Sequence, residues 1–165
     1  MGLHTLDPPP PPQDAPVDAT AAGLMAAQLR RVLVVEDHAM IGMLLGDLLA
    51  EMGFEVCAIA ASHSAAVLAA EQHKPDLMIV DIDLGKSSGI LAVAEILGSG
   101  FVPHLFMSGN PSWFRDLAPG TVTLLKPFDE AALADAIGRV FAAGVPAADG
   151  DGAVAAKEHS PKAKT

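Results

Sequence analysis

Acidic side chains follow two of the apolar runs in this chain of 165 residues. Glu36 and Asp37 come directly after the run RVLVV, and Asp81 ends the run DLMIVD, with Asp83 two residues further on. Carboxylates gathered at one place repel one another, so such a cluster persists only with a cation among them. Proteins usually hold Mg²⁺ with a few carboxylates, a backbone carbonyl and water. The three acids at the ends of the runs, Glu36, Asp37 and Asp81, therefore predict a magnesium site, provided that the fold brings them together.

A hydroxyl and a lysine end two later apolar runs. Ser108 closes HLFMS, and Lys126 closes TVTLLK. Phosphoryl transfer needs an in-line nucleophile and favourable groups on the three equatorial oxygens. Asp81 is an acceptable carboxylate nucleophile, which forms an acyl phosphate, and Mg²⁺, Ser108 and Lys126 can each take one oxygen. We therefore expect Lys126 to pair with Asp81 at rest and with its phosphoryl group afterwards.

Each of these residues also has a purely structural interpretation. Glu36 and Asp37 can belong to a solvated loop, Asp81 can open a turn, and Ser108 can cap a helix. Lys126 can be an ordinary lysine whose stem packs on apolar surface while its ammonium reaches water. Taken one at a time, the structural interpretation is the stronger. Taken together, three acids, a hydroxyl and a lysine at the ends of strands favour phosphoryl chemistry.

Alternating apolar runs and amphipathic stretches supply the elements that position these side chains. Five strand-and-helix units in about 115 residues indicate an α/β fold, in which a parallel sheet has helices on both faces. A doubly wound, flavodoxin-like order 2-1-3-4-5 is expected, with the ligand site outside the carboxyl ends of the strands. The expected units are 31–36 with 39–53, 55–60 with 64–74, 76–82 with 89–100, 104–108 with 111–118, and 121–126 with 129–144.

The first expected helix shows its apolar face by spacing. Five large apolar residues recur at helical intervals before a stop at Gly53. We expect this face to pack against the sheet. Its members are Met40, Leu44, Leu45, Leu48 and Met52.

Composition excludes several classes of function. The chain carries 20 acidic and 10 basic residues, which speaks against nucleic acid or an anionic membrane as partner. No stretch approaches the roughly 18 apolar residues of a membrane span, and the first residues lack the features of a secretion signal. A cytoplasmic protein is expected. The single cysteine, Cys57, lies in an apolar stretch and is interpreted as a small buried hydrophobe.

The two ends of the chain differ in composition from its centre. Residues 1–27 contain the proline run Pro8 to Pro12 and are expected to form a disordered, proline-rich arm. A ligand for an SH3-type domain is the alternative interpretation of that run. Residues 28–144 are expected to form the domain, and residues 145–165 a disordered tail. Because only a short tail follows the last expected helix, no DNA-binding or enzymatic output module is expected.

The motifs VLVVEDH, LMIVDIDL, FMSG and LLKPF, in this order and spacing, resemble those of the response-regulator receiver domain of two-component signalling. The resemblance covers residues 31 to about 143. It implies phosphorylation of Asp81 by a histidine kinase or a histidine phosphotransfer protein. It also implies Mg²⁺ on Asp37, Asp81 and the backbone carbonyl of Asp83, with Glu36 reaching the metal through water.

The same resemblance implies a mode of output. Receivers of this kind signal through altered binding to another protein, on the face made by the fourth helix, the fifth strand and the fifth helix. Many carry an aromatic residue three positions before the lysine, but Thr123 stands there and is too small to report activation. We therefore expect the loop from Gly109 to Phe114 to report it, through Trp113 and Phe114. The alternative is that these two aromatics simply anchor a short helix to the core.

The resemblance has two further consequences, one for a peptide bond of the backbone and one for the subgroup of receivers. Family members usually have a cis peptide bond between Lys126 and Pro127. The stretch FMSGNPSWF partly resembles the stand-alone FAT GUY subgroup of receivers. Phe106, Ser108 and Gly109 fit its motif, whereas Met107, Asn110 and Pro111 do not.

Two other functions compete with a signalling receiver that is not an enzyme. A degenerate receiver would dock partners without being phosphorylated. The stretch DIDLG also resembles the DxD motif of haloacid-dehalogenase-type phosphatases, where the second Asp is an acid/base for turnover. In that family Thr or Val usually stands two residues after the second Asp, where this chain has Gly85, and the acidic pair here lies upstream. The phosphatase is therefore the least favoured interpretation.

Overall fold

The computed structural model describes residues 30–144. The main sheet is built from five strands: β1 (Arg31–Val35), β2 (Glu55–Ala60), β3 (Leu77–Asp81), β6 (His104–Ser108) and β7 (Thr123–Leu125). The helices are α2 (Ala39–Glu51), α3 (His63–His73), α4 (Gly89–Leu97), the 3₁₀ helix η1 (Pro111–Asp116) and α5 (Glu130–Ala142). The expected arm over 1–27 and tail over 145–165 lie outside the described residues. No helix in the described part is long and apolar enough to cross a membrane.

The order of the sheet is β2-β1-β3-β6-β7, and all neighbouring strands are parallel. This confirms the flavodoxin-like order expected from the sequence. The numbering differs because a two-stranded hairpin, β4 (Asp83–Leu84) with β5 (Ser87–Ser88), follows β3. The hairpin was not predicted, since strands of two residues leave no periodic signal.

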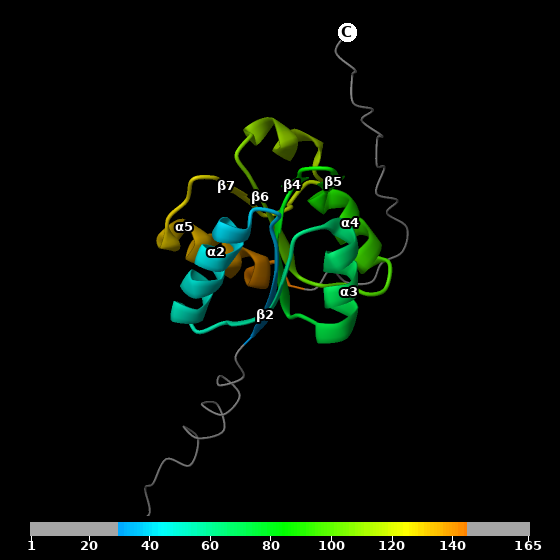
Figure 1. The fold of residues 1–165 in the computed structure, drawn as a ribbon. Coiled ribbons are helices and arrows are strands. Elements are labelled where there is room, and N and C mark those ends of the chain that lie inside the picture. The colour runs from blue at the N-terminus through cyan, green and yellow to red at the C-terminus, as the bar shows by residue number, and fades with distance from the viewer. Residues whose placement is uncertain (1–29, 145–165) are drawn as a thin grey trace, which may run out of the picture.

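Helices cover both faces of the sheet (Figure 1), α2 and α5 on one face and α3 and α4 on the other. Side chains of a strand alternate between the two faces, so Val32 and Val34 pack under α2 and α5, whereas Leu33 and Val35 pack under α3 and α4. Every residue of β3 is buried. A strand covered on both faces reads as a continuous apolar run, which explains the pattern that precedes Asp81.

The apolar face predicted for the first helix is wrong in two positions. Met40 and Leu44 are 67% and 63% exposed, and the buried residues of α2 are Gly42, Leu45 and Leu49. Gly42 lets the helix approach β2, because a Cβ there would lie 3.0 Å from Cγ2 of Ile59. Close approach at a glycine thus turns the first two apolar side chains outward.

Two further expectations need correction. The fifth strand is shorter than 121–126 and forms an edge of the sheet, and Leu125 is 47% exposed. Lys126 therefore follows the strand, although its backbone N–H still donates to the Ser108 carbonyl at 2.9 Å. Cys57 is half-buried, and its thiol donates to the Val32 carbonyl at 3.3 Å. Cys57 lies on β2, an edge strand of the sheet. Residues of an edge strand are covered less completely than residues of a central strand.

Candidate functional site

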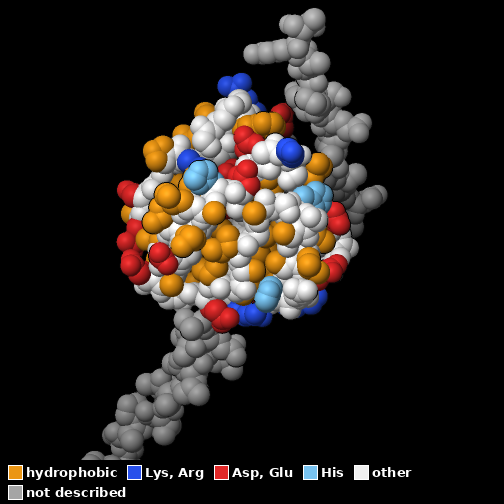
Figure 2. Space-filling view, viewed as in Figure 1, with side chains coloured by type: hydrophobic (Ala, Val, Ile, Leu, Met, Phe, Trp, Pro, Cys, Tyr) orange, Lys and Arg blue, Asp and Glu red, His pale blue; other side chains and the backbone are white. Residues whose placement is uncertain are grey.

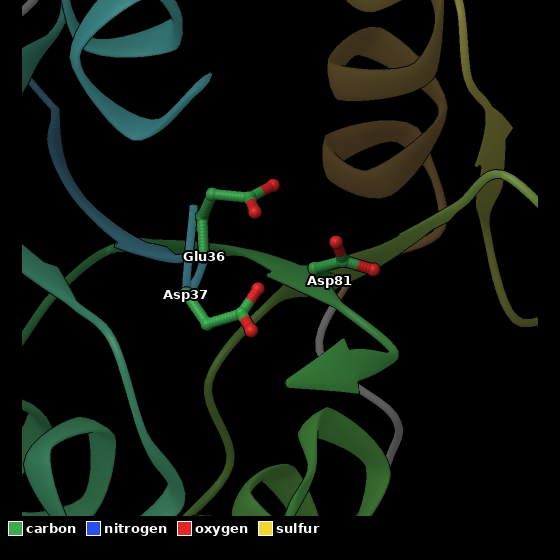
Figure 3. Close-up of side chains that lie close together, drawn as sticks. All are labelled: Glu36, Asp37 and Asp81. Carbon is green, nitrogen blue, oxygen red and sulfur yellow. The ribbon is translucent and has the colours of Figure 1, made fainter. Parts of the chain in front are cut away.

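Three carboxylates meet at the carboxyl ends of β1 and β3. Glu36 and Asp37 follow β1, and Asp81 is the last residue of β3. One carboxylate oxygen from each lies within 4.8 Å of the others, and Figure 3 shows Asp37 directed toward the same space as Asp81. Glu36 and Asp81 are buried, whereas Asp37 is exposed. Parallel strands carry their carboxyl ends to one edge, which is why residues 45 positions apart become neighbours.

Lys126 supplies the cation of the cluster. Its Nζ donates to Oδ2 of Asp81 at 2.5 Å, which is the ion pair predicted from the sequence. It also donates to Oε2 of Glu36 at 2.6 Å, which was not predicted. Burial alone would lower the pKa of the Lys126 ammonium, but its hydrogen bonds and charge interactions with Asp81 and Glu36 together raise that pKa. The lysine is therefore held protonated between two buried acids.

The second oxygens of the two buried carboxylates accept backbone hydrogen bonds. Oε1 of Glu36 accepts from the N–H of His38 at 3.0 Å, and Oδ1 of Asp81 accepts from the N–H of Asp83 at 3.1 Å. These bonds fix the direction of both carboxylates before any ligand arrives. Buried charged groups need such partners, because an unpaired charge in the interior is very costly.

The donor set fits a hard divalent cation. All three side chains offer carboxylate oxygens, the ligand type that Mg²⁺ prefers. Three carboxylates against the Lys126 ammonium leave two negative charges at the site, which a divalent ion can balance. The exposed Asp37 opens the cluster toward solvent, from which hydrated Mg²⁺ would arrive.

Two glycines pack closely beside the site, and this packing was not predicted from the sequence. A Cβ on Gly89 would lie 2.0 Å from the carbonyl oxygen of Asp81, and a Cβ on Gly85 would lie 3.1 Å from Oδ2 of Asp37. Gly85 also has a positive φ of 65°, and its N–H donates to Oδ1 of Asp83 at 3.2 Å. The hairpin and the start of α4 thus lie tightly against the carboxylates. Gly85 and Gly89 both lie in the stretch DIDLGKSSG. No local pattern in the sequence indicates that either glycine contacts the site.

Ser108 is buried at the end of β6, and its hydroxyl binds the loop that follows. Oγ accepts from the N–H of Asn110 at 3.1 Å and donates to the carbonyl of the same residue at 3.3 Å. The side chain of Asn110 in turn accepts from the N–H of Ser112 at 3.0 Å and caps η1. The predicted contact of Ser108 with a phosphoryl oxygen stays a prediction.

Two expectations drawn from the resemblance concern the backbone. The peptide bond between Lys126 and Pro127 is cis, as expected. Asp83 lies on β4 and is exposed, and its side chain turns to Gly85. The use of its carbonyl as a metal ligand stays a prediction.

Comparison with known proteins shows which family has a sequence like this one. The model of the response regulator receiver domain matches residues 32–138. The transcriptional regulatory protein PdtaR of Mycobacterium tuberculosis is 38% identical over 118 residues, which cover 68% of this chain and 57% of that protein. The phyllosphere-induced regulator PhyR of Methylorubrum extorquens is 32% identical over 119 residues, 70% of this chain and 45% of that protein. This chain thus spans about half the length of these two relatives.

Solved structures agree with the sequence comparison. The solution structure of the receiver domain of the PhyR response regulator from Erythrobacter litoralis superimposes with a TM-score of 0.69 at 34% identity. The match covers 75% of this chain and 99% of that domain. The residues of the acidic cluster, Glu36, Asp37 and Asp81, lie inside the range that the family model matches.

Proposed function

Because the chain belongs to the response-regulator receiver family, we propose that it accepts a phosphoryl group on Asp81 from a histidine kinase or a histidine phosphotransfer protein. Signalling then proceeds through altered binding to another protein. The observation that carries this proposal is the position of Asp81, which ends the central strand between Lys126 and two further carboxylates. A carboxylate so placed can act as a nucleophile beside groups that stabilise the transferred phosphoryl.

The transfer step can be written for the side chains present. An oxygen of the Asp81 carboxylate attacks the phosphorus as its bond to the donor's imidazole nitrogen breaks, and that nitrogen keeps the electron pair. The phosphoryl oxygens gain the Lys126 ammonium, already 2.5 Å from the carboxylate. Lys126 also binds Glu36. It therefore keeps one anionic partner while it exchanges the Asp81 carboxylate for a phosphoryl oxygen. Ser108 donates to a second oxygen once its hydroxyl leaves Asn110.

Mg²⁺ is the proposed cofactor. Asp37, Asp81 and the backbone carbonyl of Asp83 would hold it, and Glu36 would contact it through water. When bound, it supplies positive charge that offsets carboxylate repulsion and stabilises the phosphoryl oxygens. The fit of the carboxylates to a hard cation supports this assignment.

The phosphodonor has an apolar surface to bind beside the site. The first turns of α2 follow Glu36 and Asp37 directly and expose Met40, Ile41 and Leu44 by 67%, 38% and 63%. A donor histidine must reach Asp81, so the protein that carries it must cover the rim of the site. Exposed methionine and leucine side chains favour contact with another protein. This supports a protein as donor, with its own apolar surface against α2.

The output surface is proposed on η1, β7 and α5, and the loop from Gly109 to Phe114 is its switch. Ser108 links the site to this loop, because its hydroxyl binds the backbone of Asn110, which caps η1. Drawing the hydroxyl toward a phosphoryl group would release those bonds. Trp113 is 40% exposed and would move with η1. Half-buried Thr123, on β7, takes no part as a reporter.

The experiment that tests this function is phosphorylation by acetyl phosphate with Mg²⁺, followed by mass spectrometry and by measurement of released phosphate. Wild type is expected to gain one phosphoryl group and to keep it long enough to be detected. Asp81→Asn abolishes the gain, whereas the control Asp83→Asn, two residues away, still accepts the group. Labelling that survives in Asp81→Asn would refute the assignment. No gain in wild type would indicate a degenerate receiver that only docks partners, and rapid release of phosphate would indicate a phosphatase.

A further inference from the structure

The edge strand β2 carries an apolar surface that the phosphoryl site does not use. β2 pairs with β1, and no strand among residues 30–144 covers its outer edge. Ile59 of β2 is 44% exposed, with Met43 of α2 at 65% and Leu68 of α3 at 53%. Figure 2 shows hydrophobic side chains gathered over this face, where β2 runs between α2 and α3. These three side chains and the outer edge of β2 are called the β2 surface below.

The β2 surface lacks the lysines and prolines that protect many edge strands. Soluble proteins place lysine, proline or inward charges on such edges. β2 has the sequence EVCAIA, in which Glu55 at its first position is the one charged residue. The pairing with β1 is shifted between Val32 and Leu33, and such a bulge, which twists the strand, is the protecting feature that β2 does carry. The edge is exposed or half-buried from Glu55 to Ile59, whereas Ala60 at its end is buried.

Charge argues against a basic partner at this place. A cationic peptide would need acidic side chains opposite it, and Ile59, Met43 and Leu68 offer none. The chain as a whole has a net charge of −10, so two copies repel each other across most faces. An uncharged face is where two such copies can approach.

We propose that a second copy of this chain covers the β2 surface, with the two β2 strands paired antiparallel about a twofold axis. An axis between Cys57 and Ala58 sets Val56 opposite Ile59 of the second copy. It sets Glu55 opposite Ala60, so the two glutamates lie at opposite ends of the pair. This register avoids like charges directly opposite each other, which destabilise paired strands. The strand is thus complementary to its own copy.

The flanking helices support the same arrangement. A twofold axis perpendicular to the sheet keeps each helix on its own face, so α2 meets α2 and α3 meets α3 of the second copy. Met43 then lies near its counterpart on one face, and Leu68 near its counterpart on the other. Two five-stranded sheets join into one of ten strands, which is near the usual upper size of a twisted open sheet.

The proposed dimer is independent of the proposed phosphorylation. Asp81 lies at the carboxyl end of β3, which is separated from β2 by β1 in the sheet. The contact therefore does not cover Asp81, although it shares α2 with the surface proposed for the phosphodonor. Asp81→Asn is expected to abolish phosphorylation and to leave dimer formation unchanged, so either proposal can fail without the other.

Sedimentation velocity of the full chain tests the dimer. Over about a hundredfold range of concentration, the mean mass is expected to rise from one chain to two. Ile59→Glu and Met43→Glu each place like charges in the contact and weaken association by at least about tenfold. Leu125→Glu is the matched control, because Leu125 is similarly exposed but lies on the opposite edge strand, β7. Circular dichroism melting checks that each variant is folded.

Amide hydrogen exchange locates the contact. Protection of residues 55–60 is expected to increase with protein concentration, whereas that of 123–125 stays constant. A chain that remains monomeric throughout overturns the proposal. Protection of 55–60 that is already complete in the monomer also overturns it, because the chain itself then covers the edge. A dimer that resists both glutamate variants, or is broken by Leu125→Glu, uses another face.

Discussion

Gly89 is the residue at which a single methyl group is expected to disturb the site most. It is the first residue of α4, buried, and its N–H donates to the Ile82 carbonyl at 3.0 Å. A Cβ on Gly89 would lie 2.0 Å from the carbonyl oxygen of Asp81 and 2.6 Å from Cγ1 of Val80. Gly89→Ala therefore forces the start of α4 away from β3, beside the phosphoacceptor.

The size of the effect follows from the atoms that would have to move. The 2.0 Å contact is about 1 Å short of the 3.0 Å that real Cβ contacts respect. The opposing atom is backbone of the central strand and cannot rotate away. Overpacking of this kind costs about 1–3 kcal/mol and occasionally more, and strain on the bond to Ile82 adds to it. We expect Gly89→Ala to lower the free energy of unfolding by about 3 kcal/mol.

Urea unfolding followed by circular dichroism measures this loss. Gly138→Ala is the control, because Gly138 lies exposed inside α5 with no atom within 4 Å of an added Cβ. That variant is expected to gain about 0.5–1 kcal/mol, since alanine favours a helix over glycine. Gly89→Ala should also slow phosphorylation by acetyl phosphate, because Asp81 shifts. Equal unfolding free energies for Gly89→Ala and wild type would refute the packing argument.

The metal site, the half-buried His104 and the tryptophan each give a further prediction. Asp37→Ala removes a proposed direct ligand and is expected to weaken Mg²⁺ binding at least about tenfold, and Glu36→Ala less, in calorimetric titrations; equal affinities would count against the site. Burial lowers the pKa of His104 below its ordinary 6.5, so the unfolded state binds the proton first and stability falls as pH drops below 6.5. His104→Phe should flatten that part of the stability curve in urea unfolding, and an unchanged slope would contradict it. Beryllofluoride with Mg²⁺, which stands in for the aspartyl phosphate, is expected to shift the emission of Trp113 in wild type but not in Asp81→Asn; a constant emission would place the switch elsewhere.

Much of the fold could be predicted because the signals are local. Runs such as RVLVV and HLFMS are bounded by polar residues, and their lengths match strands β1 and β6. The order of the sheet was expected because the flavodoxin-like order is the commonest doubly wound arrangement for five strand-and-helix units. The second helix was expected over 64–74, and α3 covers His63–His73, with Ser62 as a cap that accepts from the N–H of Ala65. Such features depend on neighbours in the chain and leave a readable pattern.

Helix faces and strand depth were predicted less well. Spacing placed Met40 and Leu44 on the inner face of α2, but Gly42 faces the sheet instead. The run TVTLLK was expected to be a strand over 121–126, whereas β7 covers only Thr123–Leu125 at an edge of the sheet, with Leu125 exposed. Apolar spacing identifies which residues can be buried. Contacts with distant elements decide which of them are.

By itself the sequence determined which chemical groups stand at the ends of the strands, because hydrophobic runs and the polar residues that end them are adjacent in the chain. From that came the acids at 36, 37 and 81, the hydroxyl at 108 and the lysine at 126, and the pairing of Lys126 with Asp81. Tertiary structure alone decided that Lys126 also binds Glu36, 90 positions away, and that Gly89 touches the Asp81 backbone. These contacts depend on the twist of the sheet and the docking of α4, which are set by packing across the whole domain and leave no trace in local spacing.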